Sequence, residues 1–150
     1  MKSNAAGFYT AAFLSFLIRL DSTFEGGYGN LAFLYSELGE FEKALKVSNK
    51  LLSFKPKEAF ALNNRGYIKY KLNDLLGALE DVNNSILYVP GNSYAFRNRG
   101  LIYIAMKKNK EACADFQKAV NLGFSKEYGN EVEELIKTHC TKSSDAVRGL

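Results

Sequence analysis

The chain has 150 residues, of which 47% are hydrophobic and 24% charged, a balance typical of a globular protein and not of a disordered one. Its net charge of +4 is mild and does not by itself predict a nucleic-acid partner, and no apolar run reaches the roughly 20 residues of a membrane span. Two cysteines and one histidine are too few for a disulfide scaffold or a zinc site, so we expect no metal and no cofactor.

The first predicted element is an apolar helix over residues 7–21, inside an N-terminal segment 1–24. Residues 7–20 carry one charged side chain, Arg19, which is too few for a helix with one face in water. Three interpretations compete. The helix is a half repeat that packs on the first unit and pairs its exposed side with another copy, giving a dimer or a longer array. Alternatively, it folds across the chain's own groove or packs internally, or it is a weak secretory signal. The candidate dimer face consists of Phe13, Leu14, Phe16 and Leu17.

One fixed spacing recurs through the middle of the chain. It separates pairs or triplets of identical residues, namely Pro56 and Pro90, Gly66 and Gly100, Asn30, Asn64 and Asn98, and Ala44, Ala78 and Ala112. Several independent residues with one period indicate a repeat array, with units 25–58, 59–92 and 93–126. One period upstream, residues 7–21 correspond to the second half of such a unit.

Within each unit the pattern resembles the tetratricopeptide repeat, a helix–turn–helix of about 34 residues. A large residue opens each first helix, a small residue follows four places later, and an alanine lies in each second helix; these are Tyr28, Leu62 and Phe96, then Ala32, Gly66 and Gly100, then Ala44, Ala78 and Ala112. Turns are expected at Gly39-Glu40 and Asn73-Asp74. The resemblance implies an all-α, right-handed α-solenoid of stacked hairpins, flanked by an N-terminal helix and a C-terminal capping helix.

The capping helix is predicted over residues 127–140 and a flexible tail over 141–150. Its apolar face carries Tyr128, Val132, Leu135, Ile136 and His139. Cys140 is expected to be a reduced thiol at the helix end, and Cys113 a small buried hydrophobic residue in the third unit.

Enzymatic chemistry has little support in this sequence. A nucleophilic triad would have to recruit His139, the single histidine, from a terminal helix, and no glycine-rich phosphate loop is present. We therefore predict no catalytic residues and no small-molecule substrate.

The resemblance implies a concave surface lined by the first helix of each unit. Its candidate peptide-binding residues are Phe33, Asn63, Asn64, Tyr67, Tyr70, Lys71, Tyr94, Arg97, Asn98 and Leu101. Asn side chains can bind a peptide backbone, and Arg97 with Lys71 can hold a carboxylate. Repeat domains of this family that clamp chaperone tails need further Lys, Asn and Arg residues; here only Asn64 fits, so that type of clamp is not expected.

The predicted function is a non-enzymatic protein–protein interaction module that binds a peptide or partner segment in this groove, in the cytoplasm. The alternative is a self-assembling scaffold or secretion-type chaperone that dimerises through the apolar N-terminal helix. An RNA-binding repeat, suggested by Arg65, Arg97 and Arg99, lacks the regular side-chain pairs that read bases, so no nucleic acid is predicted.

Overall fold

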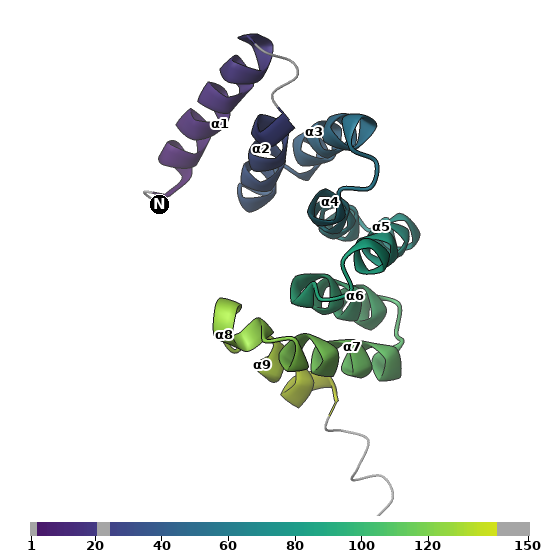
Figure 1. Cartoon of the computed structure of the whole chain (residues 1–150). Helices are drawn as coiled ribbons and strands as arrows, with labels where there is room; N and C mark the ends of the chain where they lie inside the picture. The colour runs from purple at the N-terminus through teal and green to yellow at the C-terminus, as the bar shows by residue number, and fades with distance from the viewer. Residues whose placement is uncertain (1–2, 21–24, 141–150) are drawn as a thin grey trace, which may run out of the picture.

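The computed structural model describes residues 3–20 and 25–140, and all regular structure within these ranges is helical (Figure 1). The helices are α1 (Ser3–Leu20), α2 (Glu25–Glu37), α3 (Phe41–Phe54), α4 (Ala59–Lys71), α5 (Leu75–Tyr88), α6 (Ser93–Ala105), α7 (Asn109–Asn121), α8 (Phe124–Tyr128) and α9 (Glu131–His139). The prediction of an all-α fold is confirmed. The predicted tail over 141–150 lies outside the described residues.

Three helical hairpins stack in sequence order. Each predicted unit contains one of them: α2 with α3, α4 with α5, and α6 with α7. The second helix of each hairpin packs on the first helix of the next, and α1 packs on α2 in the same way, as expected for the second half of a preceding unit. The exact unit boundaries stay a prediction.

The turn inside each hairpin repeats one backbone conformation. Gly39, Asn73 and Lys107, each one repeat period from the next, have positive φ angles of 76°, 64° and 60°. Such a residue after a helix lets the following amides bond back to the last free carbonyls, as Glu40 N does to Tyr35 O at 2.8 Å. The period of the sequence is therefore also a period of the backbone.

Glycines in α4 and α6 let the two helices of a hairpin approach closely. A Cβ atom placed on Gly66 would lie 2.6 Å from Cγ2 of Val82 and 3.1 Å from the carbonyl oxygen of Ala78. A Cβ atom on Gly100 would overlap the ring of Phe116, which is fully buried. Both glycines are therefore needed for packing within the hairpin.

We expect Gly100→Ala to destabilise the chain by about 1–3 kcal/mol, because the added methyl forces Phe116 out of a filled core. The matched control is Gly29→Ala in α2, where the new Cβ would meet only Leu51 Cδ2 at 3.6 Å. That control should gain roughly 0.5–1 kcal/mol from helix propensity. Chemical denaturation of both variants measures the difference; a stabilised Gly100→Ala would contradict this packing.

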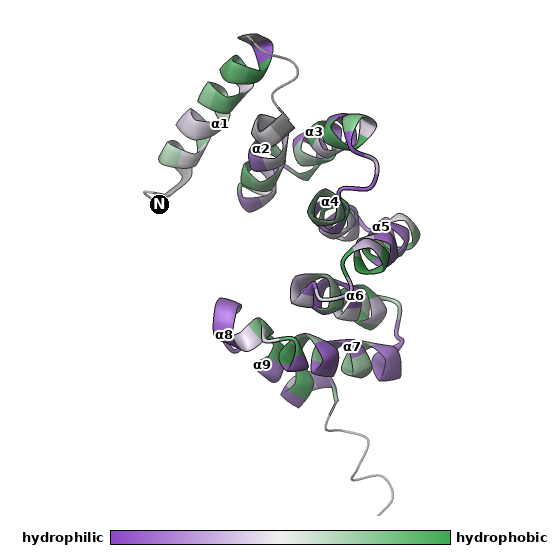
Figure 2. Cartoon of the chain, viewed as in Figure 1, coloured by the Kyte–Doolittle hydropathy of each residue, from purple (hydrophilic) through white to green (hydrophobic). Residues whose placement is uncertain are grey.

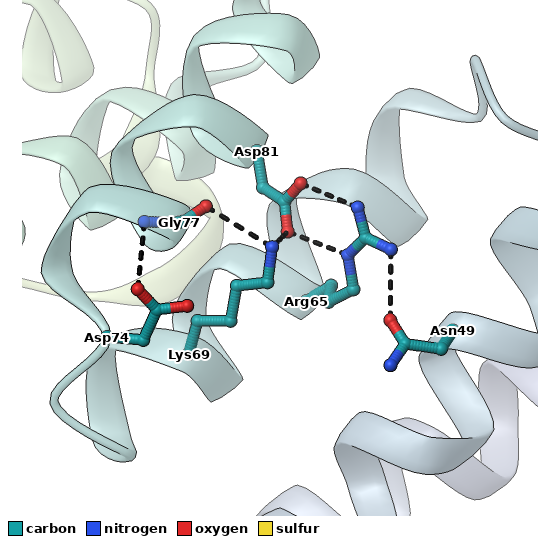
Figure 3. Close-up of polar contacts among 6 residues, drawn as sticks. All are labelled: Asn49, Arg65, Lys69, Asp74, Gly77 and Asp81. Atoms are coloured by element: carbon teal, nitrogen blue, oxygen red, sulfur yellow. Dashed lines mark hydrogen bonds and ion pairs between the residues drawn. The ribbon is translucent and has the colours of Figure 1, made fainter.

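Two arginine clamps join neighbouring hairpins on the side of the second helices. Arg65 of α4 donates from Nε and Nη2 to Asp81 of α5, both at 2.7 Å, and from Nη1 to Asn49 of α3 at 3.0 Å (Figure 3). One period later Arg99 binds Asp115 at 2.7 and 2.8 Å and Asn83 at 2.9 Å. Each clamp therefore connects its own hairpin to the preceding one.

The C-terminal cap differs from the single helix expected over 127–140. It consists of the short α8 and of α9, which are separated at Gly129, where φ is 86°. Phe124 and Val132, both fully buried, pack on Phe116 and Ala119 of α7. The apolar face of α7 is therefore covered, but by two helices, between which the chain turns at Gly129, a glycine with a positive φ angle.

Cys113 and Cys140 form a disulfide, so the prediction of a reduced thiol at Cys140 and of a merely hydrophobic Cys113 is wrong. Their Cα atoms lie 5.7 Å apart although 27 residues separate them in sequence. Packing of α9 on α7 brings them together. Cys113 lies within α7 and Cys140 directly follows α9, so only this tertiary contact brings the two sulfur atoms within bonding distance.

The N-terminal helix α1 is the most apolar element along its length (Figure 2). Ala11 is buried and Ile18 packs on the core formed by α2, α3 and α4. Within the described ranges, no helix is both long and apolar enough to cross a membrane.

Candidate functional site

The first helices of the hairpins share one side of the solenoid. In Figure 1, α2, α4 and α6 lie on the side of the arc toward which α1 and α8 project. Two adjoining hollows open between these three helices, and we refer to them together as the inner groove. This is the surface on which the sequence predicts peptide binding.

The first hollow is small, with a cavity volume of about 30 Å³. Its lining comes from α2, α4 and α6 and consists of Phe33, Ser36, Glu37, Asn64, Tyr67, Ile68, Tyr94 and Asn98. Glu37 and Phe33 are exposed, and Phe33 retains 55% of its accessible surface. The hollow therefore combines three aromatic rings, two amides and one carboxylate.

The second hollow, of about 370 Å³, lies next to the first and shares Phe33, Asn64 and Tyr94 with it. Phe60, Asn63, Asn92 and Tyr128 complete its lining. The rings of Tyr94 and Tyr128 meet edge to face, with centroids 5.1 Å apart. The cap thus extends the aromatic surface of the inner groove beyond α6.

A buried polar chain runs beneath the two hollows. Asn98 donates to Oδ1 of Asn63 at 3.0 Å and accepts from Nη1 of Arg97 at 2.8 Å. The exposed fractions of the two asparagines are only 2% for Asn63 and 1% for Asn98. Their amides therefore hold α4 against α6 and are already engaged within the fold.

Arg97 does not project freely into the inner groove as the sequence predicts. It is 8% exposed and bonds Glu131 of α9 through both Nε, at 3.2 Å, and Nη2. Its guanidinium also lies 5.6 Å from the ring centroid of Tyr67 and 5.5 Å from that of Tyr94. The charge of Arg97 is therefore neutralised inside the fold, and Glu131 occupies the place that a ligand carboxylate would take.

The electrostatic surroundings of Tyr94 show how these groups converge. Burial raises the pKa of its hydroxyl above the ordinary value, Arg97 opposes this, and Glu131, Tyr67 and Glu37 add to it. Carboxylates from α2 and from α9 thus act on one tyrosine of α6, which keeps it a neutral hydrogen-bonding group.

Three of the predicted groove residues lie elsewhere. Tyr70 and Lys71 line a separate hollow with Asn73, Leu75 and Ala105, and the Lys71 ammonium lies 5.5 Å from the ring centroid of Phe41. Leu101 packs against the core formed by α6, α7 and the cap. The inner groove therefore contains no free cation among its described lining residues.

The sequence did not indicate five residues that line the inner groove, Glu37, Phe60, Ile68, Asn92 and Tyr128, nor the Arg97 partner Glu131. Tyr128 was expected on the buried face of one capping helix, yet it is 52% exposed because the cap bends after it. Glu131 lies one full repeat period after Arg97, so the period was a signal that could have paired them. Glu37 and Phe60 carry no such signal.

The candidate dimer face is divided between two environments. Phe13 and Phe16 are 60% and 54% exposed, whereas Leu14 and Leu17 are half-buried. The helix therefore has an inner side toward α2 and an aromatic outer side, which Tyr9, 78% exposed, extends.

Comparison with known proteins places this architecture in a family. The tetratricopeptide repeat model matches residues 26–58 and 95–122. No curated protein sequence matches the chain at a significant level.

Three solved structures share the fold. The Sgt2 TPR domain from Aspergillus fumigatus is 21% identical with a TM-score of 0.72, covering 83% of this chain and 82% of that one. A MamA RS-1 double mutant is 18% identical with a TM-score of 0.71, covering 89% and 83%. The first TPR of Spaghetti (RPAP3), bound to the HSP90 peptide SRMEEVD, is 18% identical with a TM-score of 0.64, covering 78% and 96%. The matched repeats and the stacked hairpins identify the chain as a tetratricopeptide repeat protein.

Proposed function

We propose that this chain is a non-enzymatic interaction module that binds an extended segment of a partner protein in the inner groove. The observation that carries the proposal is the pair of adjoining hollows between α2, α4 and α6, with aromatic rings and amides in their lining. Tyrosine and phenylalanine supply contact area at low entropic cost, and amides bond a peptide backbone. That a solved neighbour, RPAP3, is bound to a peptide supports the idea that the fold can do this.

Asn64 is the best polar contact for such a segment. It lines both hollows, is half-buried, and its side-chain amide makes no hydrogen bond within the described part of the chain. Asn63 and Asn98, by contrast, bind each other. The proposal therefore assigns backbone recognition to Asn64 and structural support to the other two.

The partner can be found with a random 12-residue peptide display library panned against the immobilised chain. For a selected peptide, we expect Tyr67→Ala to weaken binding about 30-fold, since a buried interface tyrosine contributes roughly 2 kcal/mol. Asn64→Ala should weaken it about fivefold, because one hydrogen bond of about 1 kcal/mol is lost. Calorimetry measures both.

The matched control is Tyr88→Ala at the end of α5, a tyrosine 39% exposed that lines neither hollow. Thermal melts establish that each variant is folded. Equal affinities for all three variants would remove the binding site from the inner groove. Arg97→Ala is unsuitable as a binding probe, because Arg97 is buried and bonds Asn98 and Glu131, so its removal would disturb the fold around the inner groove.

The second candidate function is self-assembly through α1, favoured by the exposed aromatic side chains of Tyr9, Phe13 and Phe16. An apolar helix face of this kind is typical of interaction surfaces. If it pairs two copies, light scattering at about 50 µM should give twice the chain mass of 16.8 kDa, and Phe13→Glu with Phe16→Glu should give a monomer. A monomeric parent chain under these conditions would contradict self-assembly.

A cytoplasmic location remains a prediction, and the disulfide argues in the other direction. Disulfides persist mainly in oxidising compartments, and the Cys113–Cys140 bond joins two elements of the folded domain.

A further inference from the structure

We infer that the first hollow of the inner groove accepts a cationic side chain, lysine or arginine, of the partner segment, an inference that rests on the proposed function. The sequence predicts the opposite charge for the ligand, because Arg97 with Lys71 can hold a carboxylate. The placement of the charges reverses that expectation.

The cations predicted to attract an acid are not free in the first hollow. Arg97 is bonded on two nitrogens to Glu131 and on a third to Asn98, so its charge is balanced. Lys71 lies in a different hollow, above Phe41. An acidic side chain entering the first hollow would have to displace Glu131 from a nearly buried guanidinium.

The charge left in the lining is negative. Glu37, at the end of α2, is exposed, forms no ion pair within the described ranges, and lines the first hollow. Tyr94 of α6 lines the same hollow as Glu37. With the Arg97–Glu131 pair neutral, the first hollow carries the charge of one carboxylate.

The rest of the lining suits a cation that carries an aliphatic stem. Phe33, Tyr67 and Tyr94 surround the hollow on three helices, and aromatic rings attract ammonium and guanidinium groups. Arg97 already lies against Tyr67 and Tyr94, so these rings receive a guanidinium within the fold itself. A lysine or arginine stem can pack on Phe33 while its head reaches Glu37.

The test uses the peptides obtained by panning the 12-residue library against the full chain. Among peptides whose affinity falls with Asn64→Ala, we expect lysine or arginine to be enriched at one position. Replacing that residue by glutamine should weaken binding about tenfold. Glu37→Gln should weaken the cationic peptide by a similar factor and leave its glutamine counterpart unchanged. Glu80→Gln, an exposed carboxylate of α5 outside both hollows, is the matched control.

The experiment distinguishes the inferred cationic ligand of the first hollow from the proposed peptide binding in the inner groove. If groove-dependent peptides show no cationic preference, or prefer Asp and Glu, the inferred ligand chemistry is overturned and the peptide-binding groove stands. If Glu37→Gln and Glu80→Gln weaken the cationic peptide equally, the effect is one of net charge and the inference is also overturned. If no selected peptide depends on Asn64 or Tyr67, the proposed function falls together with the inference.

Discussion

Replacing both cysteines by serine should lower the free energy of unfolding by about 3.5 kcal/mol. The Cys113–Cys140 bond closes a loop of 27 residues, and the chain-entropy relation for a loop of that length gives this value at 25 °C. For a chain of this size the melting temperature should fall by roughly 7–14 °C. Circular dichroism melts of the parent chain and of Cys113→Ser/Cys140→Ser measure the change.

Dithiothreitol provides the control within one experiment. It should lower the melting temperature of the parent chain to that of the double variant and leave the variant unchanged. The loss should begin at the cap, because the bond ties the end of α9 to α7, so amide exchange should accelerate first in Glu131–His139. If dithiothreitol leaves the melting temperature of the parent chain unchanged, the disulfide does not stabilise the fold.

Arg99→Met should destabilise the chain by about 3–5 kcal/mol, the usual result of removing one partner of a buried ion pair. Asp115 is only 5% exposed, and both of its oxygens accept from Arg99. The same hydrogen bond raises the pKa of the Arg99 guanidinium above its ordinary value. Urea denaturation measures the loss.

Arg65→Met is the matched comparison, because it removes the equivalent clamp one repeat earlier. Asp81 would keep a second cation, since Nζ of Lys69 lies 2.9 Å from its Oδ2 (Figure 3). Arg65→Met should therefore cost at least about 1 kcal/mol less than Arg99→Met. Adding Asp115→Leu to Arg99→Met should recover most of the loss. If Arg65→Met and Arg99→Met lose equal free energy of unfolding, the loss in Arg99→Met does not come from an uncompensated charge on Asp115.

The repeat period made most of the fold predictable. Identical residues one period apart identify equivalent positions in each hairpin, such as Gly66 and Gly100, each of which faces the second helix of its own hairpin. The period could not predict where the array departs from itself. The cap bends at Gly129, and Cys113 meets Cys140 only because α9 packs back on α7.

The inner groove was only partly predictable, for a related reason. The family resemblance predicts which residues face the concave side, and Phe33, Asn64, Tyr67 and Tyr94 of that set line the first hollow. It could not say which polar side chains the fold would use itself. The sequence predicts Arg97 as a ligand-binding cation, but Arg97 pairs with Glu131. Glu131 lies beyond the last repeat, in a cap for which the sequence predicts only the covering of an apolar face.

The most direct test is NMR cross-saturation from a protonated, library-selected peptide to the perdeuterated chain. If the peptide binds in the inner groove, saturation should be transferred to residues of α2, α4 and α6 around Phe33, Asn64, Tyr67 and Tyr94. Transfer confined to α1, or to the second helices α3, α5 and α7, would show that the partner docks elsewhere and would contradict peptide binding in the inner groove.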